Sequence, residues 1–149
     1  MRRWFSFVLL FIWMGVIFLF SSEGHDASSS RSDAVIHLIP HASHWSHEFM
    51  TFVARKLAHS FNYFVLGILM LNVVRDFIPR ARRAVILSGL FVMLYAVSDE
   101  IHQIFVPGRG PLVTDVLIDS VAGALGIILF YGVLKLVATR RMAKELASS

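Results

Sequence analysis

The sequence predicts an all-α integral membrane protein, a bundle of four transmembrane helices with an additional interfacial amphipathic segment. Three observations favour this fold: 56% of the 149 residues are hydrophobic, the apolar residues gather in four long runs, and basic residues flank those runs. A soluble domain of this length could not bury so much apolar surface, whereas about twenty apolar residues suffice for a helix to span a bilayer. Residues 1–149 are expected to form a single membrane domain.

The first apolar run extends from Trp4 to Phe20, after Arg2 and Arg3, and predicts a transmembrane helix over about 4–22. A cleaved signal peptide is the alternative for such a segment. However, no small-residue pattern typical of a cleavage site directly follows Phe20. The next residues, 21–31, are small and polar and predict an irregular loop.

An amphipathic segment is expected over about 34–50, lying on the membrane surface. Apart from an interruption at Pro40, its histidines have the spacing of one helical face. They are His37, His41, His44 and His47. A pH sensor or a metal-binding stripe is the functional alternative to a simple wetted helix face.

Three further apolar runs predict transmembrane helices over about 52–74, 84–105 and 112–137. The loops between them set the orientation, because short cytoplasmic loops are rich in Lys and Arg. The connection from Arg75 to Arg83 holds four arginines, and basic residues also occur before Trp4 and after Val137. This pattern places both termini in the cytoplasm. It also explains the net charge of +4 without nucleic acid as a partner.

Polar side chains gather at those ends of the last three helices that this topology places outside. They are Lys56, His59 and Asn62, then Asp99, Glu100, His102 and Gln103, and finally Asp115 and Asp119. Helical spacing adds Tyr63 to the stripe of Lys56 and His59. The turn over 106–111 contains proline and glycine and is expected to bring Arg109 back over the carboxylates. Charges in a membrane are costly, so these groups are expected to pair or to bind a ligand.

The segments 55–63, 98–109 and 115–119 together resemble the VanZ-like family of bacterial membrane proteins, and the similarity extends to 20–22 and 123–126. In that family position 62, an asparagine here, is more often a glutamate. The resemblance implies a multi-pass protein of the bacterial cell envelope, in the inner (cytoplasmic) membrane. Its name-giving member is associated with low-level resistance to the antibiotic teicoplanin, and the resemblance implies no settled reaction.

Three functions are compatible with these residues. In the first, an outward pocket binds a membrane lipid headgroup, a lipid-linked envelope precursor or a glycopeptide-like ligand. Its ligand-binding residues are predicted to be Lys56, His59, Tyr63, Asp99, Glu100, His102, Gln103, Arg109, Asp115 and Asp119.

The second function is a metal-assisted hydrolase or transferase that acts on a lipid-linked substrate. Candidate ligands of a divalent metal ion are Asp99, His102, Asp115 and Asp119, and the candidate general base is Glu100 or His59. The third is a structural accessory subunit, in which the charges only hold the helices together. The chain has no cysteine, which excludes disulfides and thiolate metal sites. The sequence leaves the oligomeric state open.

Overall fold

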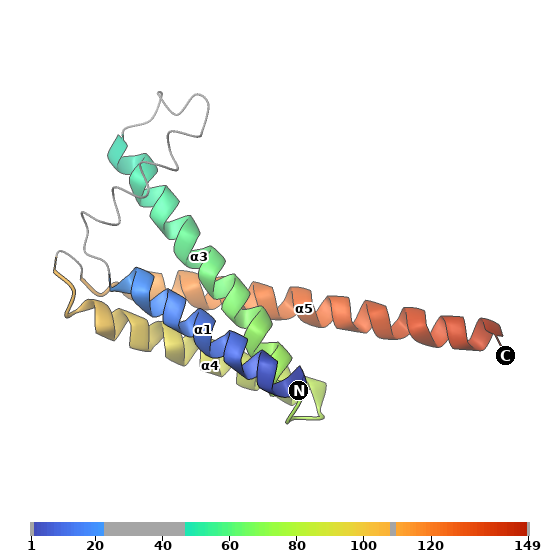
Figure 1. Ribbon diagram of the computed structural model, residues 1–149. Helices are drawn as coiled ribbons and strands as arrows, with labels where there is room; N and C mark the ends of the chain where they lie inside the picture. Colours follow the sequence, from blue (N-terminus) through green and yellow to red (C-terminus); the bar gives the residue numbers. More distant parts are fainter. Residues whose placement is uncertain (1, 23–46, 108–109, 149) are drawn as a thin grey trace.

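The computed structural model describes residues 2–22, 47–107 and 110–148, and within these ranges the regular structure is entirely helical. The helices are α1 (Arg2–Ser21), α3 (His47–Val74), α4 (Ala81–Gln103) and α5 (Val113–Ser148) (Figure 1). The predicted all-α class is therefore confirmed. Residues 47–50 continue as the first turn of α3, and the rest of the predicted surface segment, 34–46, lies outside the described residues.

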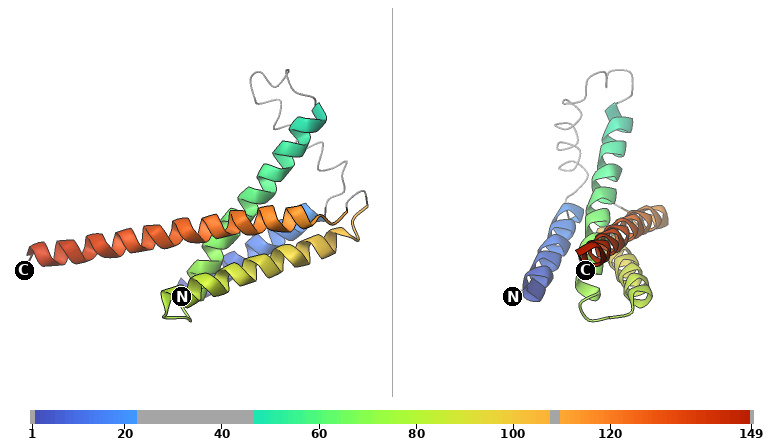
Figure 2. Two further views of the ribbon diagram at one scale, coloured as in Figure 1. Left: turned by 180° about the vertical axis from the view of Figure 1, so that it is seen from behind. Right: turned by 90° about the vertical axis from the view of Figure 1, so that its right-hand side faces the viewer.

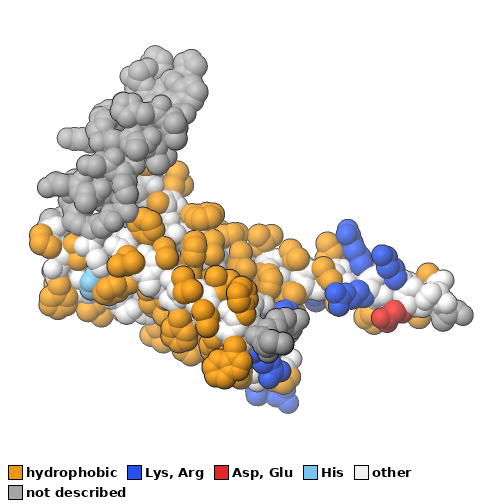
Figure 3. All heavy atoms as spheres, viewed as in Figure 1, with side chains coloured by type: hydrophobic (Ala, Val, Ile, Leu, Met, Phe, Trp, Pro, Cys, Tyr) orange, Lys and Arg blue, Asp and Glu red, His pale blue; other side chains and the backbone are white. Residues whose placement is uncertain are grey.

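All four helices are long and apolar enough to cross a membrane. Their outward surfaces carry large apolar side chains such as Phe11 on α1 and Phe91 on α4, both more than half exposed. Figure 3 shows these apolar side chains over the bundle, and Lys and Arg side chains near the far end of α5. An apolar exterior is what a bilayer requires of a folded protein, so burial and hydropathy agree on a multi-pass membrane protein.

The last helix is longer than the sequence predicts, since α5 continues beyond residue 137 to Ser148. The segment 138–148 contains neither glycine nor proline and is rich in Ala, Arg, Lys and Leu, which favour helix. The extra turns project away from the other helices, as two views show (Figures 1 and 2). Hydropathy predicts only the apolar part of such a helix, because the basic extension lies beyond the apolar run.

The closest packing in the bundle is between α3 and α5, which make the most extensive contacts of any helix pair. A Cβ atom added at Gly67 would overlap the carbonyl oxygen of Gly123, and one at Gly126 would overlap the carbonyl oxygen of Phe64. The two backbones are thus in direct contact. Small residues allow this approach in membrane helices, where dispersion rather than the hydrophobic effect drives association.

Three side-chain hydrogen bonds attach α1 to its neighbours. The amide Nδ2 of Asn72, on α3, donates to the hydroxyl of Ser6 at 3.1 Å. The indole Nε1 of Trp13 donates to the backbone carbonyl of Asn62 at 2.9 Å, on α3. The hydroxyl of Tyr95, on α4, donates to the carbonyl of Met14 at 2.7 Å. These bonds give polar atoms within the spans a partner and fix the height of α1 against the bundle.

Candidate functional site

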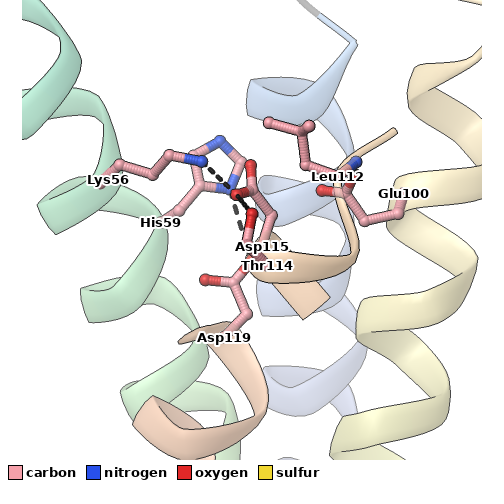
Figure 4. Close-up of polar contacts among 7 residues, drawn as sticks. All are labelled: Lys56, His59, Glu100, Leu112, Thr114, Asp115 and Asp119. Carbon is pink, nitrogen blue, oxygen red and sulfur yellow. Dashed lines mark hydrogen bonds and ion pairs between the residues drawn. The ribbon is translucent and has the colours of Figure 1, made fainter. Parts of the chain in front are cut away.

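The polar side chains of all four helices meet at one end of the bundle, which we call the polar end. It lies where α1 and α4 end and where α5 begins, beside the first part of α3 (Figures 1 and 4). The helices α3 and α5 run in the opposite direction to α1 and α4. Its members are Ser21; Lys56, His59 and Tyr63; Asp99, Glu100, His102 and Gln103; and Asp115 and Asp119. The antiparallel course of successive helices therefore brings together residues that lie far apart in the sequence. Arg109 lies outside the described residues.

An ion pair between Lys56 and Asp115 joins α3 to α5 (Figure 4). Both side chains are 20% exposed, so the pair is partly shielded from solvent. The Lys56 ammonium also lies 5.4 Å from the centre of the Phe52 ring, within the range of a cation–π contact. Asp115 belongs to the first turn of α5, where the helix dipole stabilises negative charge.

One turn further along both helices, His59 faces Asp119. The imidazole Nδ1 lies 4.0 Å from a carboxylate oxygen of Asp119, too far for a direct hydrogen bond. Asp119 is buried, whereas Lys56 and Asp115 remain partly accessible. The ionisable groups thus form two levels between α3 and α5, a partly exposed outer pair and an inner pair of which only Asp119 is buried.

Glu100 holds the connection between α4 and α5. Its carboxylate accepts a hydrogen bond of 2.8 Å from the backbone N–H of Leu112, which directly precedes α5 (Figure 4). N–H groups at the start of a helix lack partners within the helix, so Glu100 supplies an acceptor and a favourable negative charge. This contact gives the carboxylate a structural role. Its predicted role as a general base stays a prediction.

A second set of polar atoms, which we call the inner polar group, consists of Ser21, Tyr63 and Asp99. These residues come from α1, α3 and α4, and the two hydroxyl-bearing side chains face the Asp99 carboxylate. Ser21 and Tyr63 are 0% exposed and Asp99 is 4% exposed. No hydrogen bond of good geometry reaches their side-chain oxygens from any described residue.

A cavity of about 130 Å³ opens between α3 and the start of α5. Its polar lining residues are Arg55, Lys56, His59, Gln103, Asp115 and Asp119, and its apolar ones include Phe52, Leu112 and Ile118. Arg55 was not among the predicted ligand-binding residues. A helical pattern in which 52, 55, 56 and 59 share one face would have identified it.

The four predicted metal ligands all lie at the polar end, but they make different contacts there. Asp115 and Asp119 line the cavity, Asp99 belongs to the inner polar group, and the His102 ring packs on Phe18 with centroids 4.2 Å apart. In the described part of the chain, no three His, Asp or Glu side chains are arranged to hold a metal ion. The donor set therefore does not fit the divalent site of the metal-assisted alternative.

Comparison with known proteins gives one match. A family model described as VanZ/LLP1 matches residues 5–136, a range that includes every residue of the polar end. No curated protein and no solved structure matches the chain.

Proposed function

The chain belongs to the VanZ/LLP1 family, and from this premise we propose that its cavity binds the anionic headgroup of a membrane lipid or of a lipid-linked envelope precursor. The observation that carries the proposal is the lining of the cavity. Arg55, Lys56 and His59 supply positive or polar groups on one side. Cationic side chains in a partly dry site bind phosphate through charge-assisted hydrogen bonds.

Arg55 is the main candidate anchor for phosphate. It lines the cavity and makes no ion pair with another described residue, whereas Lys56 is already engaged by Asp115. A guanidinium group can donate two parallel hydrogen bonds to phosphate oxygens. A phosphate would also compete with Asp115 for Lys56, so binding would exchange one ion pair for another.

The rim of the cavity supports a ligand with an apolar part. Phe52, Leu112 and Ile118 line it and are exposed by 47%, 51% and 42%. In a membrane-spanning chain such exposed side chains contact acyl chains. The volume of about 130 Å³ is comparable to that of a small ligand-sized cavity. This space suits a headgroup rather than an entire glycopeptide.

The test is the amount of lipid retained by the purified protein. The wild type, Arg55→Gln and Arg55→Gln combined with Lys56→Gln would be purified in one detergent, and bound lipids quantified by mass spectrometry. We expect anionic lipid per protein to fall at least about tenfold in the double variant, since each charge-assisted contact contributes about 1.5 kcal/mol or more. Arg82→Gln, at an exposed site near the start of α4, is the matched control.

An unchanged amount of anionic lipid in the double variant would contradict the proposal. It would favour the structural accessory subunit, a function with which the Lys56–Asp115 ion pair is also consistent. In cells the proposal predicts that Asp99→Asn or Arg109→Ala abolishes function in an envelope-stress or teicoplanin susceptibility assay. Protein levels in the membrane should not change. If cells with either variant became susceptible to teicoplanin while the protein stayed at its normal level in the membrane, the polar end would be connected to antibiotic resistance.

The proposal places the polar end on the outer side of the inner membrane and both termini in the cytoplasm. Because the chain has no cysteine, single-cysteine variants can be labelled without background. A membrane-impermeant thiol reagent added to intact cells should label Gly110→Cys and not Ala147→Cys, both at exposed sites. The reverse pattern would contradict the orientation.

A further inference from the structure

The inner polar group contains buried oxygen atoms without partners. Both carboxylate oxygens of Asp99 and the hydroxyls of Ser21 and Tyr63 are buried, and no described residue forms a hydrogen bond with them. Nearly all buried polar atoms in folded proteins have a partner, and the exceptions often indicate a water molecule or an ion. Here four such atoms face one another across three helices, so a single occupant could satisfy them all.

The electrostatics of this group favour a cation. Asp99 is a carboxylate at 4% exposure, and the nearest lysine of the polar end, Lys56, is paired with Asp115. Asp119 adds negative potential at Tyr63. His102 is close enough to Asp99 for an electrostatic interaction, but its ring packs on Phe18. Its Nδ1 has no hydrogen-bond partner in the described chain. A buried carboxylate without a fixed counter-charge is unfavourable, and a bound cation removes that penalty.

We propose that Asp99, Ser21, Tyr63 and Gln103 bind one monovalent metal cation, sodium or potassium, in the inner polar group. The Gln103 side chain is buried beside Asp99, with its amide directed at that carboxylate. A rotation of the amide by half a turn would present its oxygen to a bound cation. All these donors are hard oxygen atoms, which suit hard cations. One carboxylate among neutral oxygens matches a single positive charge, whereas divalent ions in proteins are usually held by more carboxylates.

The site lies behind the cavity and does not depend on the headgroup proposal. Gln103 and Asp119 line the cavity and also lie near Asp99, so they separate the two sites. A cation at Asp99 would lower the negative potential next to the cavity.

The experiment measures the thermal unfolding midpoint of the purified full chain by tryptophan fluorescence, using its three tryptophans. The protein would be dialysed into NaCl, KCl or choline chloride at equal ionic strength, and the metal cation then titrated against choline. A ligand that binds only the folded state raises the midpoint with its concentration. We expect the wild type to be more stable in at least one of the two metal salts, with a saturable dependence on concentration.

Three variants locate the effect. Asp99→Asn should abolish the salt difference, while Tyr63→Phe and Ser21→Ala should raise the apparent dissociation constant at least about tenfold, since each removes one ligand. Tyr131→Phe and Ser148→Ala are matched controls, because both lie on α5 away from the inner polar group, and they should respond like the wild type. Should Asp99→Asn fail to fold, the two milder variants still test the site.

Equal midpoints in all three salts for the wild type would overturn the proposal, and the occupant would then be water. A salt effect that persists unchanged in Tyr63→Phe and Ser21→Ala would also overturn it, because the cation would bind elsewhere. Lipid retention by the Arg55 variants is a separate readout. Either proposal can therefore fail without the other.

Discussion

The polar end and the crossing of α3 with α5 solve the problem of helix association in opposite ways. At the crossing, glycine lets the backbones touch, and a Cβ at Gly67 would already overlap the neighbouring helix. At the polar end, the ion pair of Lys56 with Asp115 joins the two helices beside a cavity of about 130 Å³. The crossing has no space for a ligand, and the polar end has polar atoms that the described chain leaves unsatisfied.

This difference separates stability from binding. A tightly packed contact fixes the position and angle of two helices, because even one added carbon atom must displace backbone. The cavity lies near the start of α5, a few turns from that fixed point. Variants at the crossing should therefore change folding, whereas variants at the polar end should change ligand binding with smaller effects on folding.

The largest effect is expected from Gly67→Leu and Gly126→Leu. Either side chain would force α3 and α5 apart, and overpacking of this kind destabilises by about 3 kcal/mol or more. Thermal unfolding and size-exclusion chromatography in detergent would measure the loss. Gly132→Leu is the control on α5, since a Cβ there meets nothing within 4 Å. If Gly132→Leu were equally damaging, the crossing would not be what holds the helices together.

A smaller effect is expected from breaking the Lys56–Asp115 ion pair. A double-mutant cycle with Lys56→Gln and Asp115→Asn should give a coupling energy of about 1 to 2 kcal/mol, because the pair is only partly exposed. Asp115→Asn combined with Lys135→Gln, an exposed lysine on the same helix, should be additive. Zero coupling for the first pair would mean that water already weakens the contact.

The contact of Glu100 with the start of α5 should contribute less. Glu100→Ala is expected to destabilise by about 1 kcal/mol, and Glu100→Gln by about half as much because the amide keeps an acceptor. Hydrogen exchange of the amides at 112–116 should accelerate in the alanine variant. Glu145→Ala, exposed near the far end of α5, should leave that exchange unchanged. Faster exchange in both variants would indicate a general loss of stability.

The smallest effects are expected at α1. Trp13→Phe and Tyr95→Phe each remove one interhelical hydrogen bond, and such bonds in membrane proteins contribute about 0.6 kcal/mol on average. The shift of the unfolding midpoint would measure both. A loss as large as that of Gly67→Leu would show that α1, rather than the crossing, determines the stability of the bundle.

Much of the fold follows from the sequence alone. Apolar runs of membrane length predict the four helices, and the polar residues at their ends predict that Lys56 and the carboxylates share one level. The sequence does not predict which carboxylate pairs with Lys56. That choice depends on the relative height of α3 and α5, which the contact of Gly67 with Gly123 sets in three dimensions.

The different environments of the acidic residues could not be predicted from the sequence either. Helical spacing places Asp115 and Asp119 on one face, but it cannot show that both line one cavity while only the second is buried. It likewise cannot show that the His102 ring packs on Phe18 while it also lies near Asp99. The predicted ligand-binding roles of these residues stay predictions until binding is measured.

The contact with α3 divides α5 into two parts of unequal length. With a rise of about 1.5 Å per residue, about 15 Å of helix precede Gly123 and about 37 Å follow it. A tilt about this contact would move the basic tail in the opposite direction from the start of α5 and more than twice as far.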